Sequence, residues 1–252
     1  MLSIVRYKFG IPVNDVFFSH NPCDTGRSRI ITYYVQAAVP ADGFYQFKTQ
    51  VINLSSPTAS LFAELSSNTR YKIRRAEREG ICGRLITSPT EGDVSEFSDF
   101  FDRFATLKAL PRSNRKKMRA LATASGLLLT RATDASGTTL VAHAYITDRD
   151  SARLRLLYSA SHFRASEDTE ERNRIGRANR FLHWHEIEQA KKLGFEQYDL
   201  GGIPIDQRDP AKNAIARFKS EFGGTHVIEY NGYHSSNPLI QRCLPTLRRI
   251  LT

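Results

Sequence analysis

The segment from Gln197 to Gly224 constrains the fold of this chain more than any other stretch. It reads QYDLGGIPIDQRDPAKNAIARFKSEFGG: a short apolar strand that ends at paired glycines, a proline-bounded polar loop, and an amphipathic helix that closes on two further glycines. Glycine supplies the turn after the strand and the natural end of the helix. This order predicts a strand-to-helix crossover unit, the junction at which α/β folds place their sites.

Length and composition predict one large or two small globular domains. The 252 residues are 40% hydrophobic, which is enough for a sizeable core, and no apolar run is long enough to span a membrane. The start, MLSIVRYKFG, lacks the apolar core of a signal peptide, so we expect a cytoplasmic protein. Cys23, Cys82 and Cys243 are far apart without metal-ligand spacing, so neither a disulfide framework nor a metal site is predicted.

The positive charge of the chain is concentrated in clusters. A formal net charge of +10 comes from 36 basic and 26 acidic residues. The basic residues gather at Arg70 to Arg78, Arg112 to Arg119, Arg172 to Arg180, and Arg248 with Arg249. Such clusters indicate phosphate in a substrate or partner, and a solvated basic face is the alternative for each of them.

The first third of the chain predicts strands followed by a basic helix. We expect an edge strand over Met1 to Phe9, a loop over Gly10 to Ser28, and strands over Arg29 to Val39 and Tyr45 to Leu54. A helix start follows at Ser56, and Asn68 is the expected N-cap of a further helix that ends at Gly80. In that helix Arg70, Arg74 and Arg78 share one face, with Arg75 beside them.

The remaining pattern predicts helices around an antiparallel meander. The expected elements are helices over Asp93 to Leu110 and Asn114 to Ser125, strands over Leu127 to Thr133, Thr139 to Thr147 and Arg153 to His162, a loop over Phe163 to Arg174, a helix over Gly176 to Leu193, the opening strand and helix, a strand over Thr225 to Tyr233, and a helix from Pro238. This mixed α/β order resembles that of the GNAT-type N-acyltransferases.

Three motifs make the resemblance more specific. RYKIRRAEREGI, then GRANRFLHWHEIEQAKKLGFEQYDLGGI after the meander, then ARFKSEFGG resemble the Fem family, aminoacyl-tRNA-dependent transferases that add amino acids to peptidoglycan precursors. The motifs occur in the family's order between Ser56 and Tyr233. The resemblance implies a GNAT-type mixed sheet flanked by helices, aminoacyl-tRNA as co-substrate, and no bound cofactor.

The chain departs from the family in its domain content. Fem proteins resemble two tandem GNAT domains, whereas here residues 56–233 are expected to form the one complete GNAT-like transferase domain. Residues 1–55 are expected to form a reduced N-terminal β part that packs with the C-terminal helix in residues 234–252. This size is similar to that of small relatives that build uridyl-peptide antibiotics of the pacidamycin type. The resemblance therefore implies a peptide or peptidyl-nucleoside acceptor, with peptidoglycan-bridge formation as an alternative.

The donor is predicted from the start of the long helix. Acetyltransferases of this fold hold coenzyme A pyrophosphate with an R/Q-x-x-G-x-G/A loop, and at the matching positions Gly176 and Ala178 fit whereas Asn173 does not. This mismatch disfavours acetyl-CoA or another acyl-CoA, which is kept as the alternative donor. Arginines instead suit the phosphates of a tRNA acceptor end. The predicted tRNA-binding residues are Arg70, Arg74, Arg75, Arg78, Arg172, Arg174, Arg177 and Arg180.

The resemblance also implies the catalytic groups. Attack of an amine on an aminoacyl ester forms an oxyanion that positive charge stabilises. Lys219 would supply that charge and the backbone carbonyl of Phe218 would orient the amine; on residue type alone, Lys219 is an ordinary surface lysine. If the strands splay as in GNAT folds, the cleft would be lined by Tyr158, Ser159, Ser161, Asp199, Gly201 and Gly202.

Other readings of these residues stay open. The rival general bases are Asp199, His143 and His185, although Asp199 also suits a cap of the glycine turn and both histidines suit structural roles. Trp184 is expected in the core. The non-enzymatic alternative is a tRNA-binding module that has the fold without the activity.

Overall fold

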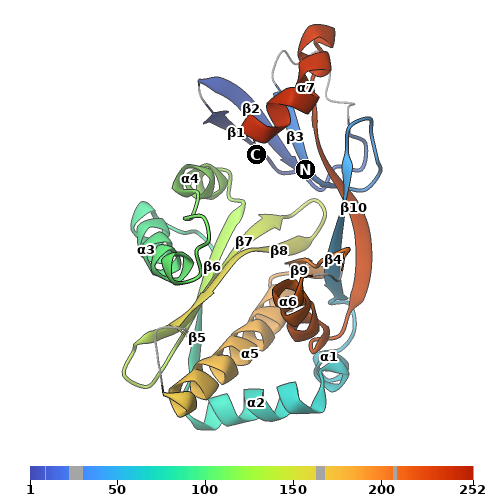
Figure 1. Ribbon diagram of the computed structural model, residues 1–252. Coiled ribbons are helices and arrows are strands. Elements are labelled where there is room, and N and C mark those ends of the chain that lie inside the picture. Colours follow the sequence, from blue (N-terminus) through green and yellow to red (C-terminus); the bar gives the residue numbers. More distant parts are fainter. Residues whose placement is uncertain (9, 23–30, 163–167, 207–208, 252) are drawn as a thin grey trace.

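One mixed sheet of ten strands organises the chain (Figure 1). The computed structural model describes residues 1–8, 10–22, 31–162, 168–206 and 209–251. The strand order is β1-β2-β3-β10-β4-β9-β8-β7-β6-β5, with parallel pairing between β2 and β3 and between β8 and β9, and antiparallel pairing elsewhere. The strands are β1 (Ser3–Lys8), β2 (Ile11–Phe17), β3 (Ile31–Ala37), β4 (Tyr45–Asn53), β5 (Cys82–Ile86), β6 (Leu127–Thr133), β7 (Thr139–Asp148), β8 (Arg153–Ser161), β9 (Gln197–Gly202) and β10 (Thr225–His234).

The helices cover both faces of this sheet. They are α1 (Thr58–Glu64), α2 (Ser67–Arg78), α3 (Glu91–Leu107), α4 (Arg115–Thr123), α5 (Thr169–Lys192), α6 (Pro210–Ser220) and α7 (Pro238–Leu251). The pleat of β6 separates two cores: Leu128 packs in the core shared with α1, α2 and α5, whereas Leu127 and Leu129 pack in the core shared with α3 and α4. Trp184 is buried against Phe62 in the first core, as expected.

Side-chain caps fix where the helices begin. The Ser66 hydroxyl accepts from Thr69 N and starts α2, so the prediction of Asn68 as its N-cap is wrong by two residues. Thr90 and Asp93 form a reciprocal capping box that starts α3. The carboxylate of Asp168 accepts from Glu170 N and Glu171 N and starts α5.

Two stretches predicted as loops are regular structure. Strand β2 lies within the predicted loop over residues 10–28, of which residues 23–28 are outside the described residues. Its pattern is concealed because Asp15 occupies a buried position, where Arg6 and Lys117 pair with it. The predicted loop over residues 163–174 includes residues outside the described part, and from Thr169 onward it is the first turns of α5.

The N-terminal strands and the C-terminal helix lie together at one end of the molecule (Figure 1). Val13, Ile31, Tyr233 and Leu244 form a small buried cluster that joins β2, β3, β10 and α7. Strand β4, from the predicted N-terminal part, lies between β10 and β9 within the same continuous sheet. The division at residue 55 therefore stays a prediction. Among the described helices, none has the length and apolarity to cross a membrane.

Candidate active site

The sheet opens where β8 and β9 diverge. These parallel strands pair only from Arg153 with Gln197 to Arg155 with Asp199, and no ladder pair joins them beyond that point. Helix α6 follows β9 and lies beside the opening (Figure 1). A cleft of about 640 Å³ forms there between β8, β9, α5 and α6. Its polar lining comes from Lys108, Ser159, Ser161, Asn179, His183 and Lys219.

Lys219 places an ammonium group in this cleft. Its Nζ donates to the carbonyl oxygen of Gly202 at 2.7 Å, which ties the end of α6 to the end of β9. Burial lowers the pKa of Lys219 to about 8, against an opposing effect of Asp199. At pH 7 the group is therefore still mostly protonated, in surroundings where a positive charge is poorly solvated.

The backbone around Lys219 is held from two sides. Gly201 has a φ of +78° and lies so close to β8 that an added Cβ would meet Leu156 O at 3.2 Å, so glycine is required there. The amide of Gln50 on β4 donates to Lys219 O at 3.0 Å. The carbonyl oxygen of Phe218 lies in the last turn of α6 and accepts from Glu221 N at 3.3 Å.

Asp199 has a structural role. Its carboxylate accepts from Gly201 N at 2.7 Å, the turn-capping role that the sequence allowed. It also accepts from Gln36 at 2.8 Å and pairs with Arg153 at 2.6 Å. Burial alone would raise the pKa of Asp199, but Arg153 and these hydrogen bonds hold it below the usual value. A fully buried, ion-paired carboxylate of this kind has no free lone pair aimed at the cleft.

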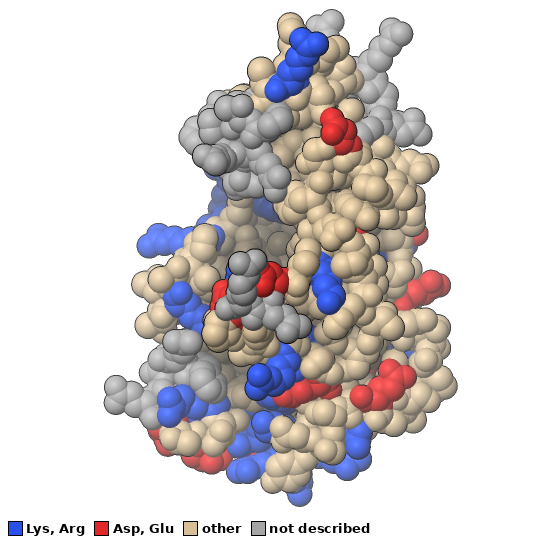
Figure 2. Space-filling view, turned by 45° about the vertical axis from the view of Figure 1, so that its right-hand side comes forward, with Lys and Arg blue, Asp and Glu red and all other residues tan. Residues whose placement is uncertain are grey.

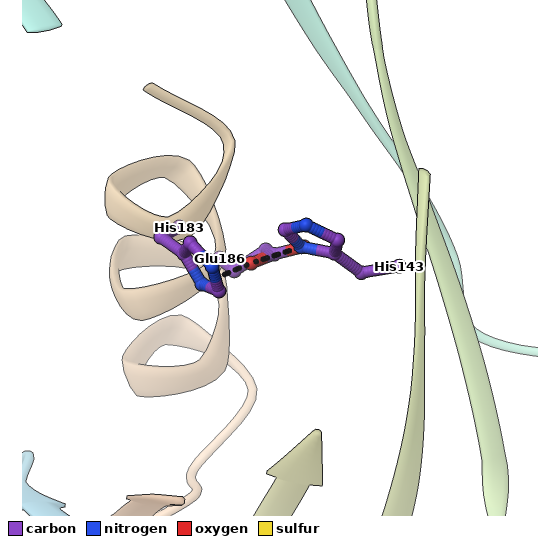
Figure 3. A group of neighbouring side chains, drawn as sticks. All are labelled: His143, His183 and Glu186. Carbon is purple, nitrogen blue, oxygen red and sulfur yellow. Dashed lines mark hydrogen bonds and ion pairs between the residues drawn. The ribbon is translucent and has the colours of Figure 1, made fainter. Parts of the chain in front are cut away.

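A buried hydrogen-bond network lies behind the cleft (Figure 3). Glu186 on α5 accepts from His143 Nδ1 on β7 at 2.9 Å, from Tyr198 at 2.8 Å, and from Thr130 and Tyr145. The other ring nitrogen of His143 lies 3.0 Å from Asn179 Oδ1. Burial opposes ionisation of Glu186, yet the two histidines hold its pKa well below the usual range. Both Glu186 oxygens and both Nδ1 atoms are thus already used, which favours a hydrogen-bond network over a metal site for His143, His183 and Glu186.

His183 connects this network to the cleft. Its Nδ1 lies 2.7 Å from the hydroxyl of Tyr198. Because that hydroxyl donates to Glu186, the network assigns the proton to His183 Nδ1 and leaves the lone pair on Nε2. Burial, with a further effect of His143, lowers the pKa of His183 to about 4. At neutral pH the cleft therefore contains an uncharged imidazole beside the ammonium of Lys219.

The structure brings together some of the predicted cleft residues and separates others. Ser159 and Ser161 line the cleft, but Tyr158 lines a different cavity on the α4 side, where Asn114 N donates to its hydroxyl. Successive side chains of a strand point to opposite faces, which explains the separation.

The sequence analysis did not identify His183, a histidine that lines the cleft, as a candidate site residue. His143 and His185 are not among the residues that line the cleft. The signal for His183 is its spacing on α5, since Asn179, His183 and Glu186 follow at i, i+4 and i+7 and so share one helix face.

The two predicted arginine clusters meet because α2 packs against α5. Carboxylates are interleaved between them. Arg75 pairs with Glu79 at 2.8 Å, and Arg177, only 5% exposed, pairs with Glu79 and Glu170 at 2.9 Å each. A buried arginine in such pairs holds the two helices together and does not face solvent.

Five other arginines of the set also have intramolecular contacts. Arg174 pairs with Asp134 and Glu171, Arg180 with Glu221, Arg70 donates to Ala63 O and Leu65 O, Arg172 to Thr169, and Arg74 lies 5.3 Å from the Phe62 ring centroid. Arg74 and Arg78 are exposed. Figure 2 shows Lys and Arg atoms along the lower edge of the molecule, with Asp and Glu atoms beside them.

Comparison with known proteins supports the fold. No protein-family profile matches the chain, and no curated protein matches its sequence. Among solved structures, FemX superposes with a TM-score of 0.62 at 11% identity, over 99% of this chain and 86% of that one. The C-terminal domain of an Agrobacterium fabrum protein named as a lysylphosphatidylglycerol synthetase gives 0.55 at 12% identity, over 97% and 84%. L-PGS from Bacillus licheniformis gives 0.55 at 12% identity, over 88% and 73%. The predicted GNAT-type fold, a mixed sheet flanked by helices, is confirmed.

Proposed function

We propose that this protein is an aminoacyltransferase that moves an amino acid from aminoacyl-tRNA to the amino group of a peptide or peptidyl-nucleoside. The observation that carries the proposal is the partly buried ammonium of Lys219 in the cleft where β8 and β9 diverge. The sequence resemblance of ARFKSEFGG to the Fem family and the structural likeness to FemX support the same chemistry.

Lys219 would stabilise the charge that develops during transfer. When the amine attacks the ester carbonyl, a tetrahedral intermediate forms and its oxygen becomes negative. An ammonium held by Gly202 O in a poorly solvated cleft needs little reorganisation to stabilise that oxygen. The intermediate then collapses, the ester C–O bond breaks, and the tRNA hydroxyl leaves with a proton while the new amide keeps the acyl group.

Two neighbouring groups would orient the attacking amine. The Phe218 carbonyl and the Nε2 lone pair of His183 are acceptors beside Lys219. An amine that donates its N–H groups to acceptors keeps its own lone pair for the carbonyl carbon. Because the pKa of His183 is about 4, the imidazole is uncharged and available as an acceptor throughout the neutral range.

The start of α5 favours an ester donor over a coenzyme A thioester. The segment from Asn173 to Ala178 lies within α5, so its N–H groups are not free to cradle a pyrophosphate. At the true start of the helix, Asp168 already accepts from the first N–H groups, and Glu170 and Glu171 follow. Three carboxylates at a helix start oppose binding of a diphosphate.

The exposed arginines of α2 would contact the tRNA backbone. Arg74 and Arg78 face solvent and Arg78 has no ion pair with a described residue. Phosphate contacts of this kind weaken steeply with salt. The buried Arg177 would support the surface by holding α2 to α5.

The decisive experiment combines donor choice with a lysine variant. Purified protein is incubated with charged tRNA mixtures or acetyl-CoA and with candidate peptide or nucleoside amines, and products are identified by mass spectrometry. We expect amide products from charged tRNA that disappear with Lys219→Met, while tRNA binding persists. If amide products formed with acetyl-CoA and not with charged tRNA, the donor would be an acyl-CoA. Full turnover by Lys219→Met would refute the catalytic assignment of Lys219.

A second variant tests the tRNA surface. Arg78→Glu should weaken tRNA binding, whereas Arg149→Glu, on the β7–β8 turn beside Phe195, is the control with the same charge change. Equal loss from both variants would indicate a general charge effect and argue against contact through α2.

A further inference from the structure

Arg155 is a partly buried cation whose guanidinium carbon lies 5.7 Å from the centroid of the Phe47 ring. It lies on β8 at the last ladder pair with β9, opposite Asp199. Its Nε is closed off from solvent and has no hydrogen-bond partner, and no described carboxylate lies within ion-pair distance of the guanidinium. Burial lowers the pKa of Arg155, which shows how poorly the charge is compensated. Buried charges in proteins are normally paired, so this one indicates a ligand.

The neighbouring carboxylates are committed to other cations. Asp199 and Glu229 pair with Arg153, each at 2.6 Å. Asp15 pairs with Arg6 at 2.8 Å and with Lys117 at 3.3 Å. Positive charge around Arg155 is therefore in excess of the carboxylates that could neutralise it.

A basic cavity lies on the α4 side of β8, and its lining includes Leu157 and Tyr158, which follow Arg155 on the same strand. It measures about 460 Å³ and is lined by four cationic side chains, Arg6, Arg112, Lys116 and Lys117, against one carboxylate, Asp15. Tyr33, Tyr158 and Tyr233 add aromatic walls and hydroxyls. Arg155 is near enough for its charge to act on Lys117 and Tyr158 in this cavity and on Lys219 in the cleft.

We propose that this cavity binds an anionic group, a carboxylate or a phosphate, of the amine acceptor, with Arg155 as one of its ligands. The assignment of the ligand as the acceptor rests on the proposed function. A guanidinium offers paired N–H donors that match either oxyanion, and Lys117 adds a second charge. With its anion held on the α4 side of β8, the acceptor amine would reach through the opening between β8 and β9 toward Lys219, while the aminoacyl ester occupies the cleft beside α6.

Binding can be tested without any transfer reaction. The melting temperature is measured for the wild type, Arg155→Met, and the control Arg119→Met, whose arginine lies on the same helix as Lys117 but pairs with Glu91 outside the cavity. The probes are inorganic phosphate, the dipeptide alanyl-alanine, and its C-terminal amide. At about 100 times the dissociation constant, a bound probe should raise the melting temperature by roughly 5 °C or more.

The expected result is a shift in the wild type and in Arg119→Met that is lost in Arg155→Met. General salt effects act equally on all three proteins and cancel in the comparison. A shift with alanyl-alanine but not with its amide identifies a carboxylate, and a shift with phosphate identifies a phosphate. Equal shifts in Arg155→Met and the wild type would overturn the proposal.

A second variant tests the site independently, in case Arg155→Met does not fold. Arg112 and Lys116 are exposed, so Arg112→Gln with Lys116→Gln should fold normally and weaken probe binding at least tenfold. Unchanged binding in this variant would also count against the site. Because these measurements need no tRNA, anion binding without transfer refutes the proposed function alone, and transfer without anion binding refutes this site alone.

Discussion

Replacing Lys219 by methionine should stabilise the protein while it abolishes transfer. A lysine in water has a pKa of 10.5, and burial lowers that of Lys219 to about 8. At 1.36 kcal/mol for each pKa unit, keeping the ammonium charged in the folded state costs about 3 kcal/mol, and partial exposure of the side chain reduces this to roughly 2 kcal/mol. Loss of the hydrogen bond to Gly202 O offsets up to about 1 kcal/mol.

The expected net gain for Lys219→Met at pH 7 is about 1–2 kcal/mol, or roughly 3–6 °C in melting temperature for a chain of this size. The gain depends on pH with a defined sign. Between pH 8 and pH 10.5 the unfolded state binds more protons at this lysine than the folded state, so the wild type becomes more stable as pH rises and its deficit shrinks.

Urea unfolding of both proteins at pH 7 and pH 9.5 measures the effect, and Lys219→Arg, which retains the charge, is the matched control. We expect the difference between wild type and Lys219→Met to fall by more than half at the higher pH. A methionine variant that is less stable at pH 7, or a difference that does not change with pH, would refute the reasoning that Lys219 is a poorly solvated cation.

Three further predictions concern Lys219, the buried network behind the cleft, and the glycine turn after α6. The transfer rate at saturating substrate should fall about tenfold per pH unit above pH 8, as Lys219 loses its proton; a rate that holds to pH 10 would contradict this. Glu186→Gln should lower the free energy of unfolding by about 3 kcal/mol. Because the folded-state pKa of Glu186 is depressed, the wild type should lose more stability than this variant as the pH falls from 5 to 3, as urea titrations can show. Gly224→Ala should cost about 2 kcal/mol or more, since its φ is +81° and an added Cβ would lie 2.5 Å from Val51 O; an unchanged melting curve would refute it.

The sequence predicted the elements whose patterns are local. The meander from Leu127 to His162 alternates apolar and polar residues between turn signals, and β6, β7 and β8 lie there. The segment from Gln197 to Gly224 forms β9 and α6 with the glycine turn between them. Strand β2 was not predicted because the charged Asp15 interrupts its apolar pattern. Asp15 is tolerated at a buried position since it pairs with Arg6, which is nearby in the sequence, and with Lys117, which is far away.

The sequence by itself determined the GNAT-type order of elements, the placement of Lys219 at the end of α6, and the clustering of arginines. Only the tertiary structure decided what those charges do. It neutralised Arg177 with Glu79 and Glu170, lowered the pKa of Lys219 by burial, and left Arg155 Nε without a hydrogen-bond partner among the described residues. The reason is physical: periodicity and propensity act over a few residues, whereas the burial of a charge and its choice of partner depend on segments that meet only when the sheet is assembled.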